Sequence, residues 1–84
     1  MGAYQMVNTQ KLVEAMEESI VLLTYTCLVT NVEKQREVTV AKQFTNNFEL
    51  PHRIIDNKVM CYDVEFRKWH DIEIDTIIKW KRVE

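Results

Sequence analysis

The sequence predicts a mostly β fold with one N-terminal helix, and three observations carry the prediction. Apolar residues recur at helical spacing near residue 9, whereas from residue 20 onward they mostly alternate with polar ones, as strands require. One Gly and one Pro are present, so a flexible linker is not expected. The 84 residues suffice for one domain, because a chain of this size buries about 60% of its unfolded surface. We expect an irregular N-terminus over residues 1–8 and a single domain over residues 9–84.

Composition and charge narrow the class of protein. Hydrophobic residues make up 46% of the chain and charged residues 29%, as in ordinary globular proteins. The net charge of −2 gives no overall attraction to nucleic acid or to an anionic membrane. The longest apolar run, Ile20 to Leu23, is far shorter than the roughly 20 residues that span a bilayer, and no charged-then-apolar leader opens the sequence. We therefore expect a cytoplasmic protein in which Cys27 and Cys61 are reduced.

A short amphipathic helix is predicted over residues 9–18. Asn8 or Thr9 can cap its start by accepting a hydrogen bond from a free backbone N–H. Negative charge near residue 18 opposes the helix dipole, so the helix should end near Ser19. The apolar positions that follow at near-helical spacing are Leu12, Val13, Met16 and Ile20.

Five strands are predicted after the helix, over residues 20–30, 36–44, 59–66, 69–75 and 77–83. Polar residues between 31 and 35 indicate a hairpin turn, and Arg67 with Lys68 indicates a second one. The long connection over residues 45–57 contains Pro51 and either plugs one end of the fold with its apolar side chains or serves function. A helix followed by five strands in fewer than 90 residues predicts a barrel of the SH3-like or Sm-like type.

Acidic side chains are predicted to gather on one surface of the third and fourth strands. They are Asp63, Glu65, Asp71, Glu73 and Asp75. Two interpretations stay open: a solvated outer face that keeps the strands soluble, or an acidic patch that meets a basic partner. Asp75 has a further local alternative, because an Asp before a bend can bond the backbone amides there.

A basic set with two tryptophans is the competing candidate surface. Its members are Lys58, Arg67, Lys68, Lys79, Lys81 and Arg82, with Trp69 and Trp80 beside them in sequence. Surfaces for single-stranded nucleic acid stack bases on aromatic rings and neutralise phosphates with cations. We expect Trp69 in the core, whereas Trp80 suits either the core or the surface.

No catalytic or metal site is predicted from spacing. A nucleophile and its base could come only from Cys27, Cys61, His52 and His70, and no spacing links them on one element. Structural zinc sites draw their ligands in closely spaced pairs, which this sequence lacks. We expect neither an enzyme nor a bound cofactor or metal.

One segment resembles a known family. It reads Tyr62-Asp63-Val64-Glu65, then Trp69, Ile72, Ile74-Asp75 and Ile77. This pattern resembles the end of WYL domains, the Sm-like barrels of many bacterial transcription regulators, and most of all the small stand-alone WYL-like proteins of bacteria and their phages. The resemblance covers about residues 50–78. The resemblance implies that the chain folds as an Sm-like barrel and acts as a regulatory protein.

The positions that carry ligand binding in that family differ here. The namesake Trp-Tyr-Leu tripeptide is replaced by Asn57-Lys58-Val59. The family commonly places arginines around its Trp and in the next strand, to engage nucleotides or nucleic acid, and those positions read His70, Glu73 and Thr76 here. A change from Arg to Glu turns attraction of a phosphate into repulsion. The resemblance therefore implies the scaffold, with an altered ligand.

Three functions follow as hypotheses. We expect a non-catalytic regulatory module, in transcription or phage-host control, that acts through a protein partner, with His70 and Glu73 among its contact positions. The second hypothesis is single-stranded nucleic-acid or nucleotide binding through Lys79, Trp80, Lys81 and Arg82, assisted by Arg53 and Arg67. The third is a homo-oligomer built through the last strand, because unpaired strand edges join copies of a chain.

Overall fold

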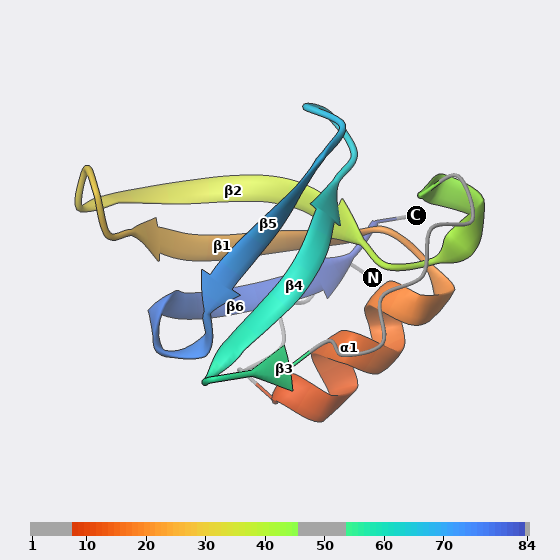
Figure 1. Ribbon diagram of the computed structural model, residues 1–84, viewed down its shortest axis with the longest axis horizontal. Helices are drawn as coiled ribbons and strands as arrows, with labels where there is room; N and C mark the ends of the chain where they lie inside the picture. Colours follow the sequence, from red (N-terminus) through yellow and green to blue (C-terminus); the bar gives the residue numbers. More distant parts are fainter. Residues whose placement is uncertain (1–7, 46–53, 84) are drawn as a thin grey trace.

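The computed structural model describes residues 8–45 and 54–83. Within them, helix α1 (Thr9–Glu18) precedes six strands: β1 (Val21–Cys27), β2 (Val32–Thr39), β3 (Ile54–Ile55), β4 (Lys58–Asp63), β5 (Lys68–Glu73) and β6 (Ile77–Arg82). Single-turn helices η1 (Lys42–Phe44) and η2 (Ile74–Thr76) follow β2 and β5. The predicted class, mostly β with one N-terminal helix in a small barrel-like fold, is confirmed (Figure 1).

Helix α1 begins and ends where its local sequence predicts. The Asn8 side chain accepts a hydrogen bond from the N–H of Lys11 at 3.1 Å and caps the first turn. At the other end Ser19 adopts an extended conformation. One face of the helix is buried among the core residues, as an apolar stripe of helical period requires. Its buried residues are Leu12, Ala15 and Met16.

Strands β1 and β2 form one antiparallel hairpin, and β4 and β5 form another. The two hairpins are joined by a short stretch of pairing between β2 and β4, beyond which they diverge. The order across the sheet is β6-β1-β2-β4-β5, and the two-residue β3 pairs with the start of β4. Strands β2 and β4 pair only through Val38 with Asp63 and Thr39 with Tyr62. In Figure 1 the β4–β5 hairpin consequently crosses in front of the long β1–β2 hairpin. Beyond the shared pairs β2 and β4 separate, and the beginning of β4 pairs with β3 instead.

The core lies between these hairpins, α1 and β6. It comprises Leu12, Ala15, Met16, Val21, Leu23, Val38, Val40, Val59, Cys61, Ile72, Ile77 and Trp80. Trp80 is 3% exposed and stands opposite Leu23 in the register of β1 and β6. Its proposed place in a base-stacking surface is therefore wrong. Trp69 packs against the core from its margin and meets Tyr62 edge-on, with ring centroids 5.4 Å apart.

The first hairpin turn lies earlier than predicted. Strand β1 ends at Cys27, and the turn occupies residues 28–31 in place of 31–35. Asn31 closes it with a φ of 57° and an N–H bond of 2.7 Å to the carbonyl of Cys27, a conformation that Asn tolerates well. Residues 32–35 belong to β2, and the polar side chains at 33–35 are tolerated in a strand because this part of the hairpin is exposed to solvent.

Three further strand ends differ from prediction. The strand predicted over residues 69–75 ends at Glu73, where η2 begins. Strand β2 stops at Thr39, because the N–H of Val40 bonds the carbonyl of Met16 at 3.0 Å and draws the chain onto α1. The segment predicted to complete this strand forms η1. Strand β4 stops at Asp63, and residues 64–67 form a turn in which Arg67 has a φ of 58°.

The long connection is described only in part. Arg53, and Phe48 and Leu50 of the predicted plug, lie outside the described residues. Ile54–Ile55, near the end of this connection, form β3, a strand that was not predicted. Among the described residues, no helix is long and apolar enough to cross a membrane.

Candidate functional site

A groove separates the free edge of β5 from the β1–β2 hairpin. One part, the turn half, has a volume of about 390 Å³, and residues 26–29 of the hairpin line it. The other part, the basic half, has a volume of about 470 Å³ and lies between β2 and the start of β5. The two halves meet at Tyr25 and His70, which line both. We take them together as the candidate site.

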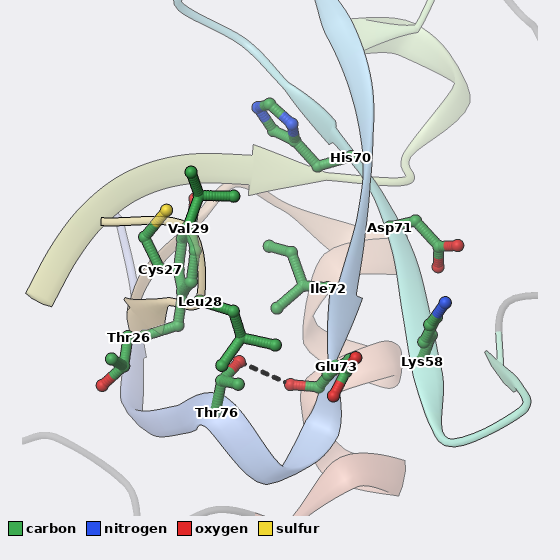
Figure 2. Close-up of a pocket in the computed structure, with 11 residues that line it drawn as sticks. Thr26, Cys27, Leu28, Val29, Lys58, His70, Asp71, Ile72, Glu73 and Thr76 are labelled. Atoms are coloured by element: carbon green, nitrogen blue, oxygen red, sulfur yellow. Dashed lines mark hydrogen bonds between the residues drawn. The ribbon is translucent and has the colours of Figure 1, made fainter. Parts of the chain in front are cut away.

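Exposed apolar side chains form one wall of the turn half. Leu28 is 64% exposed and Val29 is 93% exposed. Figure 2 shows these residues on one side of the space and β5 on the other, with Ile72 and Glu73 on that strand. Below them the hydroxyl of Thr76 donates a hydrogen bond of 2.6 Å to the carbonyl of Glu73. The turn half therefore combines an apolar wall with a strand edge.

The thiol of Cys27 also lines the turn half. A hydrogen bond from the Thr30 side chain, aided by backbone groups of Thr30 and Val29, lowers the pKa of this thiol to about 7. Burial instead raises the pKa of Cys61 to about 12. The structure thus brings Cys27 and His70 to one groove, although no sequence spacing links them.

The basic half joins aromatic rings and cations. Tyr25, Phe66, Lys34, Arg36 and Lys68 line it together with Gln35 and His70. The guanidinium of Arg36 lies 4.0 Å from the centroid of the Phe66 ring, a distance at which cation and ring attract each other. Arg36 also pairs with Asp63 at 2.9 Å and with Glu65 at 3.1 Å. Its charge is balanced within the protein, so the positive character of this half comes from the exposed Lys34 and Lys68.

A buried carboxylate beneath the groove links three strands. Asp63 at the end of β4 accepts a hydrogen bond of 2.9 Å from Arg36 on β2, and its Oδ2 lies 3.0 Å from Nε2 of His70 on β5. It also accepts the backbone N–H bonds of Glu65 and Phe66 at 3.0 and 2.9 Å. Burial pushes the pKa of Asp63 upward, but these hydrogen bonds together outweigh it and lower the pKa to about 2. Asp63 is fully buried, so its predicted place in an acidic surface patch is wrong.

The predicted site residues fall on different surfaces. His70 and Glu73 line the groove. Lys79 and Lys81 alternate on β6 with the buried Trp80, which separates the ring from the cations. The other two described cations lie elsewhere: Arg67 in the exposed β4–β5 turn, and Arg82 at the end of β6, paired with Glu18 of α1 at 3.0 Å.

Of the residues that line the basic half, Lys68 and His70 were predicted to belong to a binding surface, whereas the others were missed. Lys34 was assigned to a turn, and Arg36 and Tyr25 received no functional role. A signal was present, because residues 33–37 read Glu-Lys-Gln-Arg-Glu. Alternation of this kind places both cations on one face of a strand, provided that the segment is recognised as a strand.

Comparison of the chain with protein-family models, curated proteins and solved structures finds no match. In the two described stretches, no group of three or more His, Cys, Asp or Glu side chains is placed to hold a metal ion.

Proposed function

We propose that the protein is a non-catalytic, WYL-like binding module of the cytoplasm that acts in regulation through a protein partner docked at the groove beside β5. The observation that carries the proposal is the exposure of Leu28 and Val29 at 64% and 93% on the rim of that groove. Apolar side chains gathered at a hairpin tip stabilise no core, and such patches beside polar residues are typical of interaction sites.

The chemistry of the groove favours binding over catalysis. The pairing of His70 with Asp63 resembles a catalytic pair in outline, but Asp63 is fully buried and also holds Arg36 and two turn amides. A carboxylate so engaged fixes the positions of strands. The neighbouring thiol of Cys27 has its hydrogen bonds from the turn, through Thr30. We therefore assign this network to the scaffold of a binding surface.

The WYL-like assignment rests on the residues of the second hairpin. Tyr62 and Trp69 are opposite each other in the β4–β5 register and their rings are in contact. Asp63 accepts the N–H bonds that close the turn, and Ile77 lies in the core. These four members of the motif have structural roles, in keeping with a shared scaffold whose ligand differs.

Affinity capture from a lysate of the source cell tests the protein partner. A double variant, Leu28→Asp with Val29→Asp, places two charges on the apolar rim. A matched control, Ile78→Asp, changes another exposed apolar residue, 42% exposed on β6. We expect partners held by the wild type to be lost by the double variant and kept by the control. Capture of the same proteins by all three folded chains would contradict the proposal.

The basic half supports a second candidate, the binding of single-stranded nucleic acid. Tyr25 and Phe66 lie there with the exposed Lys34 and Lys68, and rings beside cations suit stacked bases and phosphates. Titration of labelled DNA and RNA strands at two salt concentrations tests it. Binding that weakens with salt, and falls in the double variant Lys34→Glu with Lys68→Glu but not in Lys11→Glu, would favour this candidate over a protein partner.

A further inference from the structure

We propose that the groove takes an extended segment of the partner, added as an antiparallel strand to the free edge of β5. The segment carries a basic residue near its N-terminus, an acidic residue near its C-terminus, and apolar side chains at alternate positions between them. This inference rests on the proposed function and specifies the chemistry of the partner.

The free edge of β5 has backbone groups in position to pair. Among the described strands, β5 pairs only with β4. The N–H of Ile74 bonds the carbonyl of Asn57 at 2.9 Å, which fixes the phase of this antiparallel ladder. Since hydrogen-bonded pairs alternate, Ile72 directs its backbone groups to β4, whereas the backbone groups of Asp71 and the N–H of Glu73 point away from β4. The Glu73 carbonyl already accepts the Thr76 hydroxyl at 2.6 Å. An edge of this kind is a template for an added strand.

Charge along the groove sets the direction of the segment. Lys34 and Lys68 line the basic half at the start of β5. The turn half has two carboxylates, Asp71 and Glu73, against one lysine, Lys58, so acidic charge prevails there. Antiparallel pairing is slightly more stable per residue than parallel pairing. An antiparallel segment begins opposite Glu73 and ends opposite Lys68. Complementary charge therefore requires a basic residue first and an acidic residue last.

The apolar rim sets the pattern between the two charges. Leu28 and Val29 stand across the turn half from Ile72 (Figure 2). Successive side chains of a strand point to opposite faces. Every second side chain of an added strand therefore meets this wall and the others meet solvent. An alternating apolar and polar segment fits.

A second copy of this chain fits the edge less well. Its β6 is an edge strand, paired only with β1 among the described strands. Antiparallel addition of β6 to β5 would place Lys81 and Arg82, at the end of β6, beside Lys68 at the start of β5. Like charges that face each other across strands are destabilising. The charges thus favour a segment from another protein.

Fluorescence anisotropy with two labelled heptapeptides tests the direction and the charges. The first reads Lys-Val-Thr-Val-Thr-Val-Asp, and the second exchanges its terminal Lys and Asp. We expect the first to bind at least tenfold more tightly to the wild type and to lose that advantage with Lys68→Glu. Lys11→Glu, on the exposed face of α1, should leave the preference unchanged. Equal or tighter binding of the second peptide, or no binding of either, would overturn the proposal.

A proline at the free edge tests backbone pairing. Asp71→Pro removes an N–H that points away from β4, so the β4–β5 ladder keeps its bonds, while Asp71→Ala keeps that N–H. We expect at least a tenfold loss of the first peptide with Asp71→Pro and less than twofold change with Asp71→Ala. The same peptide N-methylated at its two threonines should bind the wild type at least tenfold more weakly, because the N–H groups of those positions face β5 when the first residue lies opposite Glu73. This measurement does not depend on the folding of the proline variant. Unchanged binding of the N-methylated peptide would overturn edge pairing.

Affinity capture from a lysate distinguishes a failure of the added-strand inference from a failure of the proposed function. If the Leu28 and Val29 double variant loses the partner while Asp71→Pro keeps it, the protein-partner function stands and the added strand is wrong. If the Leu28 and Val29 double variant captures the same proteins as the wild type, the proposed function itself is wrong. A dimer in light scattering that Asp71→Pro abolishes would identify a second copy as the occupant and overturn the choice of a foreign segment.

Discussion

Arg36 and Asp63 are joined by two hydrogen bonds, 2.9 Å from Nε to Oδ2 and 3.3 Å from Nη2 to Oδ1. The carboxylate is fully buried, and the Arg36 side chain is 17% exposed. The planar fork of a guanidinium matches both oxygens of a carboxylate at once. The pair fixes the Arg36 side chain beside the Phe66 ring, where both line the basic half of the groove. A buried ion pair between strands thus shapes the candidate site.

Replacement of Asp63 by Asn should destabilise the protein in a pH-dependent way. The pKa of Asp63 is lowered from 3.8 to about 2, so its ionised form contributes stability above about pH 4. That contribution is lost as the pH falls through the folded-state pKa. A shift of this size corresponds to about 2 kcal/mol. Urea unfolding at pH 7, 4 and 2.5 should show the difference between wild type and Asp63→Asn shrinking with falling pH.

The exposed Asp71, also a β-strand carboxylate, supplies the control for this experiment. Asp71→Asn should change the free energy of unfolding by less than about 0.5 kcal/mol at every pH. A difference between wild type and Asp63→Asn that stays constant from pH 7 to 2.5 would contradict the assigned ionisation.

Replacement of Arg36 by Lys tests the fork itself. Lysine keeps the positive charge but loses the two-pronged contact with Asp63 and the planar group above Phe66. We expect a loss of about 1 to 3 kcal/mol, because a buried carboxylate then lacks part of its hydrogen bonding. Arg67→Lys, in the exposed turn, should change stability by less than about 0.5 kcal/mol. Equal denaturation midpoints for the two variants would contradict a role for the fork.

Two buried threonines should respond in opposite ways to the same substitution. The hydroxyl of Thr39 lies 2.9 Å from the carbonyls of both Met16 and Ser19 and accepts the N–H of Ala41 at 3.1 Å. The hydroxyl of Thr24 is buried with no hydrogen-bond partner among the described residues. Thr39→Val should therefore cost about 1 to 3 kcal/mol, whereas Thr24→Val should be neutral or stabilising.

Thermal and urea unfolding of the two valine variants give the comparison directly, since both changes exchange a hydroxyl for a methyl group at fully buried positions. Thr39 ties the end of β2 to the end of α1, so hydrogen exchange at the last turn of the helix should also rise in Thr39→Val. Equal losses of stability in both variants would show that the hydroxyl bonds of Thr39 are not the cause.

Local chemistry made most elements predictable. Helix α1 spans Thr9–Glu18, as its cap and apolar period indicate, and β6 spans Ile77–Arg82 against a predicted 77–83. The exposed half of β2 was predicted to be a turn. Both faces of this part of the strand are exposed to solvent, so it lacks the alternation of apolar and polar residues by which a strand is recognised in a sequence. The first hairpin turn was consequently misplaced by several residues.

The site was less predictable, because it depends on how the two hairpins cross. Arg36 and Asp63 are 27 residues apart, and nothing local distinguishes a buried carboxylate from its exposed neighbours. The alternation of Asp63 and Glu65 suggested one acidic face, yet a turn begins directly after Asp63 and takes Glu65 out of the strand. Position within a hairpin, which is a tertiary property, decides which acidic residue becomes structural.

The two cysteines should differ sharply in reactivity. The pKa of Cys27 is lowered to about 7, so near neutral pH about half of this thiol is ionised, whereas the pKa of the buried Cys61 is raised to about 12. Because the thiolate is the nucleophile, iodoacetamide at pH 7 should modify Cys27 first and Cys61 only after unfolding. Mass spectrometry of peptides from timed samples measures both rates.

The side chain of Thr30 contributes most to the lowered pKa of Cys27. Thr30→Ala should therefore raise the midpoint of the pH dependence of Cys27 alkylation above 7 and slow the reaction several-fold at neutral pH. Thr26→Ala alters a neighbouring residue of the same groove and should leave that midpoint unchanged. A midpoint near 9, the ordinary value for a thiol, already in the wild type would show that the turn does not stabilise the thiolate.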